Sequence, residues 1–380
     1  MLKILWEFQC SYILFAIIVI LVCCNNISFY TICRKNEFDF VPKFCLIVEA
    51  SFCKLIIFVP NKNQMKVKIK FVDFWDGFDS YNNTFVNVLS EKYELEISDH
   101  PDYLIYSTFG YENLKYERCI KIFYTGENIT PDFNLCDYAI GFDIMEFGER
   151  YMRLPLYALY GIEELGNPKY INPQKVLNRK FCSFVVSNGT DASERARFFH
   201  LLSEYKRVDS GGAFENNIGG RVANKKEFIS NYKFNIAFEN SAKDGYTTEK
   251  IMEPMLVNSL PIYWGNRLVG LDFNPNSFIN AADYPSLEAM VERIIELDIN
   301  DDKYLSILSE PWLNQNNYLD WQERLFDFFD NILNKPLNEQ KYLSPYGYGK
   351  YYRKKMLQMH DAKQRQEKWK RICNPCYWFK

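Results

Sequence analysis

Residues 234–265 read FNIAFENSAKDGYTTEKIMEPMLVNSLPIYWG. Two short apolar runs, residues 234–238 and 260–264, have the length of buried strands, and a helix is predicted between them from about Thr247. This strand–loop–helix–strand order is the building unit of an α/β sheet, in which ligands bind beyond the carboxyl ends of the strands. The stretch therefore predicts the fold class and the position of a ligand site.

The loop and the first helical turn of this stretch concentrate polar side chains. Asn240, Tyr246, Glu249 and Lys250 lie within eleven residues of one another. The first N–H groups of a helix have no partner inside the helix, so they favour anions, and a lysine beside them suits a diphosphate. Taken alone, the same residues also fit an ordinary helix start, in which a threonine caps the helix, Glu249 compensates the dipole and Lys250 is solvated.

Three short sequence motifs in this stretch favour the diphosphate site over the ordinary helix start. In their order and spacing, F-E-N-S, Y-x-T-E-K and P-I-Y-W-G resemble the signature of the α1,3/4-fucosyltransferases of glycosyltransferase family 10, especially the bacterial members. These enzymes use GDP-fucose, and the resemblance covers roughly residues 65–333. One departure is Pro254, inside the predicted helix, where it removes a backbone hydrogen bond and is expected to bend the helix.

The region before this stretch predicts a first α/β domain, residues 65–161. Short β-rich runs alternate with polar segments that can hold helices, which is typical of a parallel, Rossmann-like sheet. There is no G-x-G-x-x-G word, so a dinucleotide cofactor is not indicated.

A carboxylate follows one of these runs directly. Glu127 lies in the word Y-T-G-E-N, which is followed by D-Y-A-I-G-F-D, residues 137–143. A loop glutamate is by default solvated, but this pair of words is similar to the acceptor-side motif of the family. The resemblance implies that Glu127 is the general base. Asp137 and Asp143, which flank the next strand, are expected to cap or brace loops.

A second Rossmann-like domain is predicted over residues 162–333. A strand at residues 181–186 precedes a helix at residues 192–205 that carries Arg195. Any single arginine is by default a surface residue, but the resemblance implies that this one binds the donor diphosphate, for which a guanidinium is well suited. Two such domains facing each other across a cleft form the GT-B architecture, which the resemblance also implies.

The two ends of the chain differ from the rest. Residues 1–64 are hydrophobic and hold six of the eleven cysteines, with an apolar run at residues 12–24. This run is shorter than the roughly 20 residues that span a bilayer. It is interpreted as part of a single-pass anchor, as a signal peptide, or as a segment upstream of a native start at Met65, and we expect the last. Residues 334–380 form a basic, aromatic tail that is either solvated or rests on an anionic membrane.

The sequence thus predicts an inverting α1,3-fucosyltransferase that transfers L-fucose from GDP-β-L-fucose to a GlcNAc-containing acceptor, as in Lewis-type or lipopolysaccharide O-chain synthesis. Glu127 takes the acceptor proton, and Arg195 and Lys250 neutralise the leaving diphosphate with help from the amides of residues 246–248. Tyr246 binds a phosphate oxygen, and Asn240 and Glu249 bind sugar hydroxyls.

No metal is expected to be required. The cleft segments hold no D-x-D word, and Cys373 and Cys376 form a lone C-x-x-C without a second pair. The net charge of −3 does not favour nucleic acid as a partner. The predicted location is the cytoplasmic face of a bacterial inner membrane. The alternatives are a GT-B transferase with another nucleotide sugar or an α1,4 linkage, a non-catalytic nucleotide-sugar-binding module, and a membrane-tethered interaction protein.

Overall fold

The computed structural model describes residues 64–187, 189, 193–314 and 320–373, together with the backbone of three strands nearer the N-terminus. The chain forms two compact units, Met1–Met65 and Lys66–Lys380. In the first unit, the described strands β1 (Ile27–Thr31), β2 (Cys45–Ala50) and β3 (Cys53–Phe58) pair antiparallel in the order β1-β2-β3. The apolar run at residues 12–24 and Cys376 lie outside the described residues.

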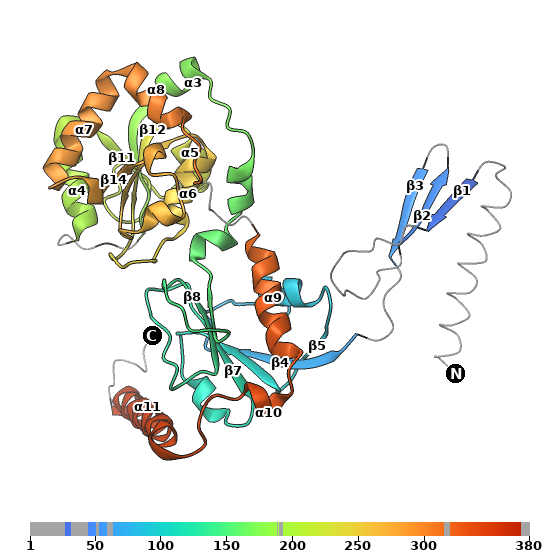
Figure 1. Ribbon diagram of the computed structural model, residues 1–380. Helices are drawn as coiled ribbons and strands as arrows, with labels where there is room; N and C mark the ends of the chain where they lie inside the picture. Colours follow the sequence, from blue (N-terminus) through green and yellow to red (C-terminus); the bar gives the residue numbers. More distant parts are fainter. Residues whose placement is uncertain are drawn as a thin grey trace. The chain divides into compact units, whose positions relative to one another are not determined.

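The second unit begins with a six-stranded parallel sheet (Figure 1). Its spatial order is β5-β4-β6-β7-β8-β9, so the chain starts in the interior of the sheet and then extends it in both directions. Its strands are β4 (Lys66–Val72), β5 (Glu94–Ile97), β6 (Tyr103–Tyr106), β7 (Ile120–Tyr124), β8 (Tyr138–Gly141) and β9 (Tyr151–Arg153). Every residue of β6, β7 and β8 is buried, as expected for parallel strands covered on both faces.

A second parallel sheet follows, in the order β11-β10-β12-β13-β14. Its strands are β10 (Lys180–Phe184), β11 (Val208–Ser210), β12 (Tyr232–Phe238), β13 (Leu260–Trp264) and β14 (Ile279–Asn280). Here too the order reverses beside the first strand, between β10 and β12. At such a switch point the connections leave to opposite faces, and a crevice opens at the carboxyl ends of the strands. Two parallel α/β sheets confirm the predicted GT-B-like fold class.

The helices follow the strands as the α/β pattern predicts. In chain order they are α2 (Thr84–Leu89), α3 (Pro173–Leu177), α4 (Glu194–Tyr205), α5 (Lys225–Ile229), α6 (Glu249–Leu256), α7 (Leu287–Ile299), α8 (Asp301–Ser309), α9 (Trp321–Leu333), α10 (Leu337–Gln340) and α11 (Gly347–Cys373). The central helix α6 begins at Glu249, two residues later than predicted, because Thr248 is its N-cap. It ends two residues after Pro254, which limits the effect of the missing N–H on the helix.

Helix α9 returns to the first sheet, although the sequence interpretation grouped it with the second domain. Asp330 accepts hydrogen bonds from the Tyr93 hydroxyl at 2.5 Å and from the Lys92 ammonium at 2.6 Å. The ring of Phe329 lies edge-on to that of Phe85 in α2, with centroids 6.0 Å apart. The chain therefore passes from the first sheet to the second and back again.

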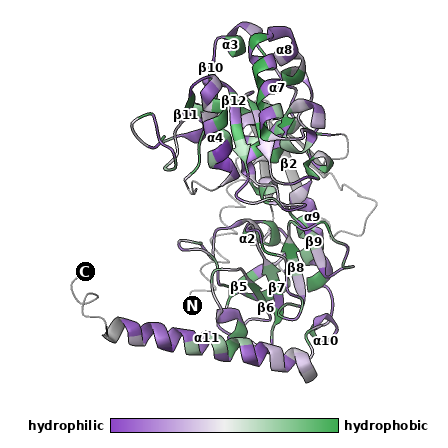
Figure 2. Cartoon of the chain, turned by 90° about the vertical axis from the view of Figure 1, so that its left-hand side faces the viewer, coloured by the Kyte–Doolittle hydropathy of each residue, from purple (hydrophilic) through white to green (hydrophobic). Residues whose placement is uncertain are grey.

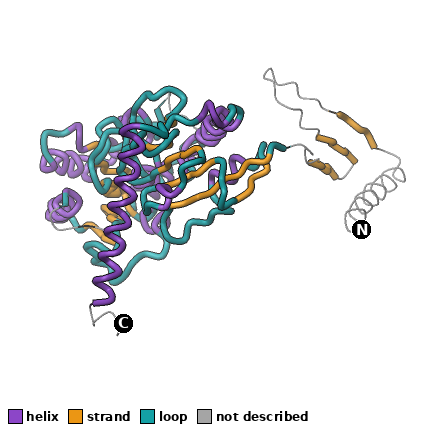
Figure 3. Tube along the Cα trace, turned by 90° about the horizontal axis from the view of Figure 1, so that it is seen from below, coloured by secondary structure: helices purple, strands orange, loops and turns teal. Residues whose placement is uncertain are grey.

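The last helix, α11, lies against the first sheet's loops. The Tyr352 hydroxyl donates to Asp132 at 3.1 Å, and the His360 ring lies 4.5 Å from that of Tyr111. Figure 2 shows this helix as largely hydrophilic, and Figure 3 shows it as one long, uninterrupted helix. Among the helices in the described part of the chain, none combines the length and the apolar character that crossing a membrane requires.

Candidate active site

Arg195 lies in the first turn of α4, beside the switch point of the second sheet. Its Nε donates to the carbonyl oxygens of Phe238 at 3.2 Å and Glu239 at 2.9 Å, where β12 ends. Burial lowers the pKa of this guanidinium, and the nearby Glu239, Tyr246 and Glu249 oppose the effect. The arginine is thus a buried cation fixed at the carboxyl end of the strand.

Glu239 is the centre of the site, and the sequence analysis did not single it out. Its fully buried carboxylate accepts hydrogen bonds from the Thr248 amide at 2.7 Å and the Thr248 hydroxyl at 2.8 Å. The Lys250 ammonium lies 3.3 Å from the same carboxylate. Burial raises the pKa of Glu239, against the influence of Lys250 and of the Thr248 hydrogen bonds. A signal was present, because an acidic residue directly follows the buried strand in the word F-E-N-S.

This arrangement corrects one detail of the predicted diphosphate site. Of the three amides expected to help bind the anion, that of Thr248 donates to Glu239, and that of Tyr246 donates to the Lys243 carbonyl at 3.1 Å. The protein's own carboxylate therefore occupies part of the helix start. A diphosphate would therefore be bound by side-chain cations rather than by these two amides.

Asn266 fixes the shape of the loop that leads into α6. Its side-chain oxygen accepts from the Gly245 amide at 2.8 Å, and its side-chain nitrogen donates to the Thr247 hydroxyl at 2.9 Å. The preceding Gly265 has φ +154°, and a Cβ there would lie 2.6 Å from Glu239 Cγ. Only glycine lets this turn approach the buried carboxylate so closely. The word P-I-Y-W-G thus ends in a residue that the site requires.

Tyr246 and Glu127 connect the two sheets. Tyr246 is buried, and its ring packs edge-on against that of Phe142 from the first sheet, with centroids 5.0 Å apart. Burial raises the pKa of the Tyr246 phenol, and the charges of Glu239 and Glu127 raise it further. Glu127 is exposed on the loop after β7, where its backbone N–H donates to the Thr125 hydroxyl at 2.9 Å. The next residue, Asn128, donates to the Ser241 hydroxyl at 2.5 Å, so the loop of the predicted base contacts the loop that leads into α6.

The structure thus brings most of the predicted site residues together. Arg195, Tyr246, Glu249 and Lys250 surround Glu239, with the Glu249 carboxylate 3.5 Å from the Lys250 ammonium. Asn240 is exposed beside them, and its side-chain oxygen accepts from the Ser241 hydroxyl at 3.1 Å. Glu127 lies on the other sheet's loop, which reaches this group through the hydrogen bond from Asn128 to Ser241 at 2.5 Å.

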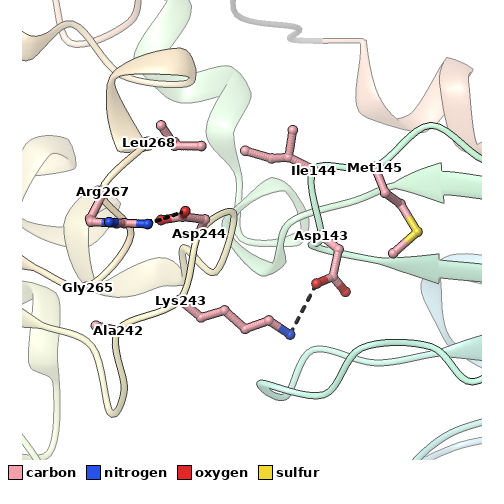
Figure 4. A pocket seen from close by; sticks show the side chains of 9 residues that line it. All are labelled: Asp143, Ile144, Met145, Ala242, Lys243, Asp244, Gly265, Arg267 and Leu268. Atoms are coloured by element: carbon pink, nitrogen blue, oxygen red, sulfur yellow. Dashed lines mark hydrogen bonds and ion pairs between the residues drawn. The ribbon is translucent and has the colours of Figure 1, made fainter.

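A pocket of about 620 Å³ lies next to this site (Figure 4). Asp143 and Lys243 form one ion pair at its edge, and Asp244 and Arg267 form another. The residues that line it are Asp143, Ile144, Met145, Ala242, Lys243, Asp244, Gly265, Arg267 and Leu268. None of the six predicted site residues is among them. The pocket therefore borders the loop that leads into α6, but the residues predicted to bind the donor lie outside its lining.

No group of three or more His, Cys, Asp or Glu side chains in the described residues is placed to hold a metal ion. The expectation that the reaction needs no metal stays a prediction.

Comparison with known proteins identifies relatives along both sheets. Residues 69–160 match the family model described as the alpha-(1,3)-fucosyltransferase FucT N-terminal domain. Residues 176–328 match the model of the glycosyltransferase family 10 (fucosyltransferase) C-terminal region.

Individual relatives give the same result. An alpha-(1,3)-fucosyltransferase FucT of Helicobacter pylori is 34% identical over 296 residues, which cover 67% of this chain and 62% of the relative. A putative fucosyltransferase of Acanthamoeba polyphaga mimivirus is 33% identical over 42% of this chain and 28% of its own. A crystal structure of an alpha1,3-fucosyltransferase with GDP-fucose is 31% identical, with a TM-score of 0.62 over 73% of this chain and 94% of that one. The chain spans less than two thirds of the length of these two curated relatives.

Proposed function

Because the chain belongs to glycosyltransferase family 10, the fucosyltransferases, we propose that it transfers L-fucose from GDP-β-L-fucose to a hydroxyl of a GlcNAc-containing glycan, with an α1,3 linkage. The family and the glycosyltransferase class predicted from the sequence words are confirmed by these matches. The proposed donor agrees with the GDP-fucose-bound structure of a relative.

The proposed reaction inverts the configuration at the fucose carbon. Inversion needs a base on the face opposite the leaving group, and we assign this role to Glu127, which takes the proton from the acceptor hydroxyl. The bond from fucose to the β-phosphate breaks as the new glycosidic bond forms, and the electron pair leaves with GDP. Arg195 and Lys250 neutralise the charge that develops on the diphosphate.

One observation carries this proposal. Two buried or half-buried cations, Arg195 and Lys250, lie at the switch point of one sheet. The loop that carries Glu127, on the other sheet, contacts the loop that leads into α6 through the hydrogen bond from Asn128 to Ser241. Transfer from a nucleoside diphosphate sugar requires cations that stabilise the anionic leaving group on one side and a proton acceptor on the other.

The remaining predicted residues have supporting roles in this proposal. Tyr246, whose raised pKa keeps the phenol protonated, donates a hydrogen bond to a phosphate oxygen. Asn240 and Glu249 bind ribose or fucose hydroxyls. Glu239, which was not predicted, orients the Lys250 ammonium from behind.

The basic helix α11 supports a second, separate proposal about location. Its lysines and arginines from residue 354 to residue 370 are exposed, as is Trp369. We propose that this helix rests on an anionic membrane surface, to which each basic residue near the surface adds about 1 kcal/mol. Flotation of the full chain with anionic but not with neutral vesicles is the expected result, and equal flotation with both would contradict it.

The function is tested by GDP release from GDP-fucose by the full chain, with and without N-acetyllactosamine, in EDTA. Acceptor-dependent release is expected, and mass spectrometry of the product then gives the added deoxyhexose. A chain that binds GDP but releases none from GDP-fucose, while using another GDP-sugar, would be a transferase with a different donor. Binding of GDP without turnover of any sugar nucleotide would indicate a binding module.

A further inference from the structure

Two polar contacts join the loop that carries Glu127 to the loop that carries Tyr246, and Asp143, on the loop after β8, makes two more with the same residues. Asn128, next to the proposed base, donates from its side-chain nitrogen to the Ser241 hydroxyl at 2.5 Å. The Lys243 ammonium lies 3.1 Å from the Asp143 carboxylate and also donates to the Thr130 hydroxyl. Thr130 in turn donates to the same Asp143 oxygen at 3.0 Å. We call these residues, with Phe142, the cross-sheet clamp.

The clamp is partly buried, which makes its ion pair unlike most surface pairs. Asp143 is 8% exposed, and its second carboxylate oxygen, Oδ2, is buried without a hydrogen-bond partner among the described residues. Lys243 is therefore the cation on which this carboxylate depends. Figure 4 shows its long side chain reaching from the second sheet's loop to Asp143.

The clamp leaves little room for the two loops to shift. The Lys243 ammonium lies over the Phe142 ring, 4.7 Å from its centroid, and the Tyr246 ring packs against the same Phe142. Gly245 has φ +88°, and a Cβ at that position would lie 2.6 Å from the Phe142 carbonyl oxygen. The backbone of the Tyr246 loop thus approaches that of the loop after β8, which carries Phe142, as closely as a missing side chain permits.

We propose that Lys243 is a positioning residue for fucosyl transfer: by holding Asp143 and Thr130, it fixes the Glu127 loop relative to the donor loop. This inference rests on the proposed function, because it assigns Glu127 as the base. The proposed role of Lys243 is indirect, because its ammonium is engaged by Asp143 and Thr130. It acts by keeping the acceptor proton within reach of the base when the donor is bound in the other sheet.

The consequence is a specific kinetic signature. Displacing a catalytic group by about 1 Å can reduce the rate about 100-fold, whereas donor binding, which depends on Arg195 and Lys250, is not altered by moving the other loop. Lys243→Met should therefore lower kcat about 10-fold or more and change GDP affinity by less than about 2-fold. Lys243→Arg, which keeps the cation, should recover most of kcat.

The experiment compares kcat and GDP affinity for the full-length wild type, Lys243→Met, Lys243→Arg and Asp143→Asn. Arg267→Gln is the matched control, because it removes a cation from the same pocket but breaks an ion pair with Asp244 that lies within one domain. The control is expected to transfer fucose like the wild type. The double variant Lys243→Met, Asp143→Asn should be about as slow as the slower single variant, because both changes break the same contact.

Three outcomes overturn the inference. An active wild type with unchanged kcat in Lys243→Met would overturn the clamp alone. A loss of GDP affinity in proportion to kcat would make Lys243 a donor-binding residue instead. A wild type that binds GDP but transfers no fucose to any glycan would overturn the proposed function, and the clamp with it.

Discussion

At the scale of single residues, two carboxylates of the candidate site differ in burial and in hydrogen bonding. Glu239 is buried and held by Thr248 and Lys250, so it serves the architecture of the donor site. Glu127 is exposed, and only its backbone forms hydrogen bonds in the described residues. The exposed Glu127 side chain can be reached by an acceptor hydroxyl, whereas the Glu239 carboxylate is enclosed and already bonded to Thr248 and Lys250.

The first prediction concerns this difference. Glu127→Gln keeps the size of the side chain but removes the base, so transfer should fall by about 100-fold or more, within the range that general-base catalysis supplies. GDP affinity, measured by calorimetry, should stay within about 2-fold, because the change lies on the other sheet from the diphosphate. Glu117→Gln, at an exposed position on the same domain, is the control. Normal transfer by Glu127→Gln would show that the base is another group.

At the scale of elements, strand β7 carries a buried lysine behind the catalytic loop. The Lys121 ammonium donates to the Asn113 carbonyl at 2.7 Å. Burial lowers its pKa to about 8, from 10.5. In the unfolded chain this lysine keeps its proton up to a higher pH than in the folded protein. Folding at neutral pH therefore carries the cost of a charged group inside the sheet.

This gives a pH dependence with a definite sign. Between pH 8 and 10.5 the unfolded state binds more protons at this site, so the lysine's contribution to the free energy of unfolding should rise with pH. Lys121→Met should stabilise the protein at pH 7 by about 2–3 kcal/mol and remove this rise. Urea unfolding of both proteins at several pH values measures the difference, with Lys68→Met, at an exposed position on β4, as control. Parallel pH profiles for wild type and Lys121→Met would contradict the prediction.

The same scale shows what the sequence could predict. The runs at residues 234–238 and 260–264 correspond to β12 and β13 because continuous apolar runs of this length mark buried parallel strands. The motifs around Tyr246 and Lys250 allowed a candidate site to be predicted because their polar residues are adjacent in the chain.

Contacts between residues far apart in the chain could not be predicted from the sequence. The contact of Lys243 with Asp143 joins residues a hundred positions apart, and no local pattern distinguishes this lysine from a solvated one. Asp143 was expected to brace a loop, and its ion pair with Lys243 braces the loop after β8 against a loop of the second sheet. Similarly, α9 has an amphipathic pattern that predicts a helix but does not tell which sheet its apolar face covers.

At the scale of the whole second unit, one buried ion pair connects the two sheets away from the site. The Arg153 guanidinium, at the end of β9, donates to both oxygens of Asp272 in the second sheet's half, at 2.8 and 2.6 Å. Asp272 is 5% exposed. The pair therefore depends on both sheets being folded, and we propose that the domains, at residues 65–161 and 162–333, unfold together.

This predicts a large effect of a remote substitution. Arg153→Met leaves the Asp272 carboxylate buried without its bidentate partner, which should lower the free energy of unfolding by about 3 kcal/mol. Arg153→Met combined with Asp272→Leu should recover part of this loss, because an apolar pair replaces the buried charges. Urea unfolding measures both. The exposed pair of Arg267 with Asp244 is the comparison, and its loss should change stability far less. Equal effects of the two Arg substitutions would show that burial is not the cause.

The return of α9 to the first sheet means that the chain joins the two sheets at two places, through residues 154–179 and again between Leu313 and Trp321. A body attached at one point can swivel in any direction, but one attached at two separate points turns freely only about the line through them. Twisting of one half against the other is thus opposed by two connections rather than one. Rotation about the remaining axis would break the contacts of Lys243 with Asp143 and of Arg153 with Asp272, so the loops of Glu127 and Tyr246 are held in one relative position.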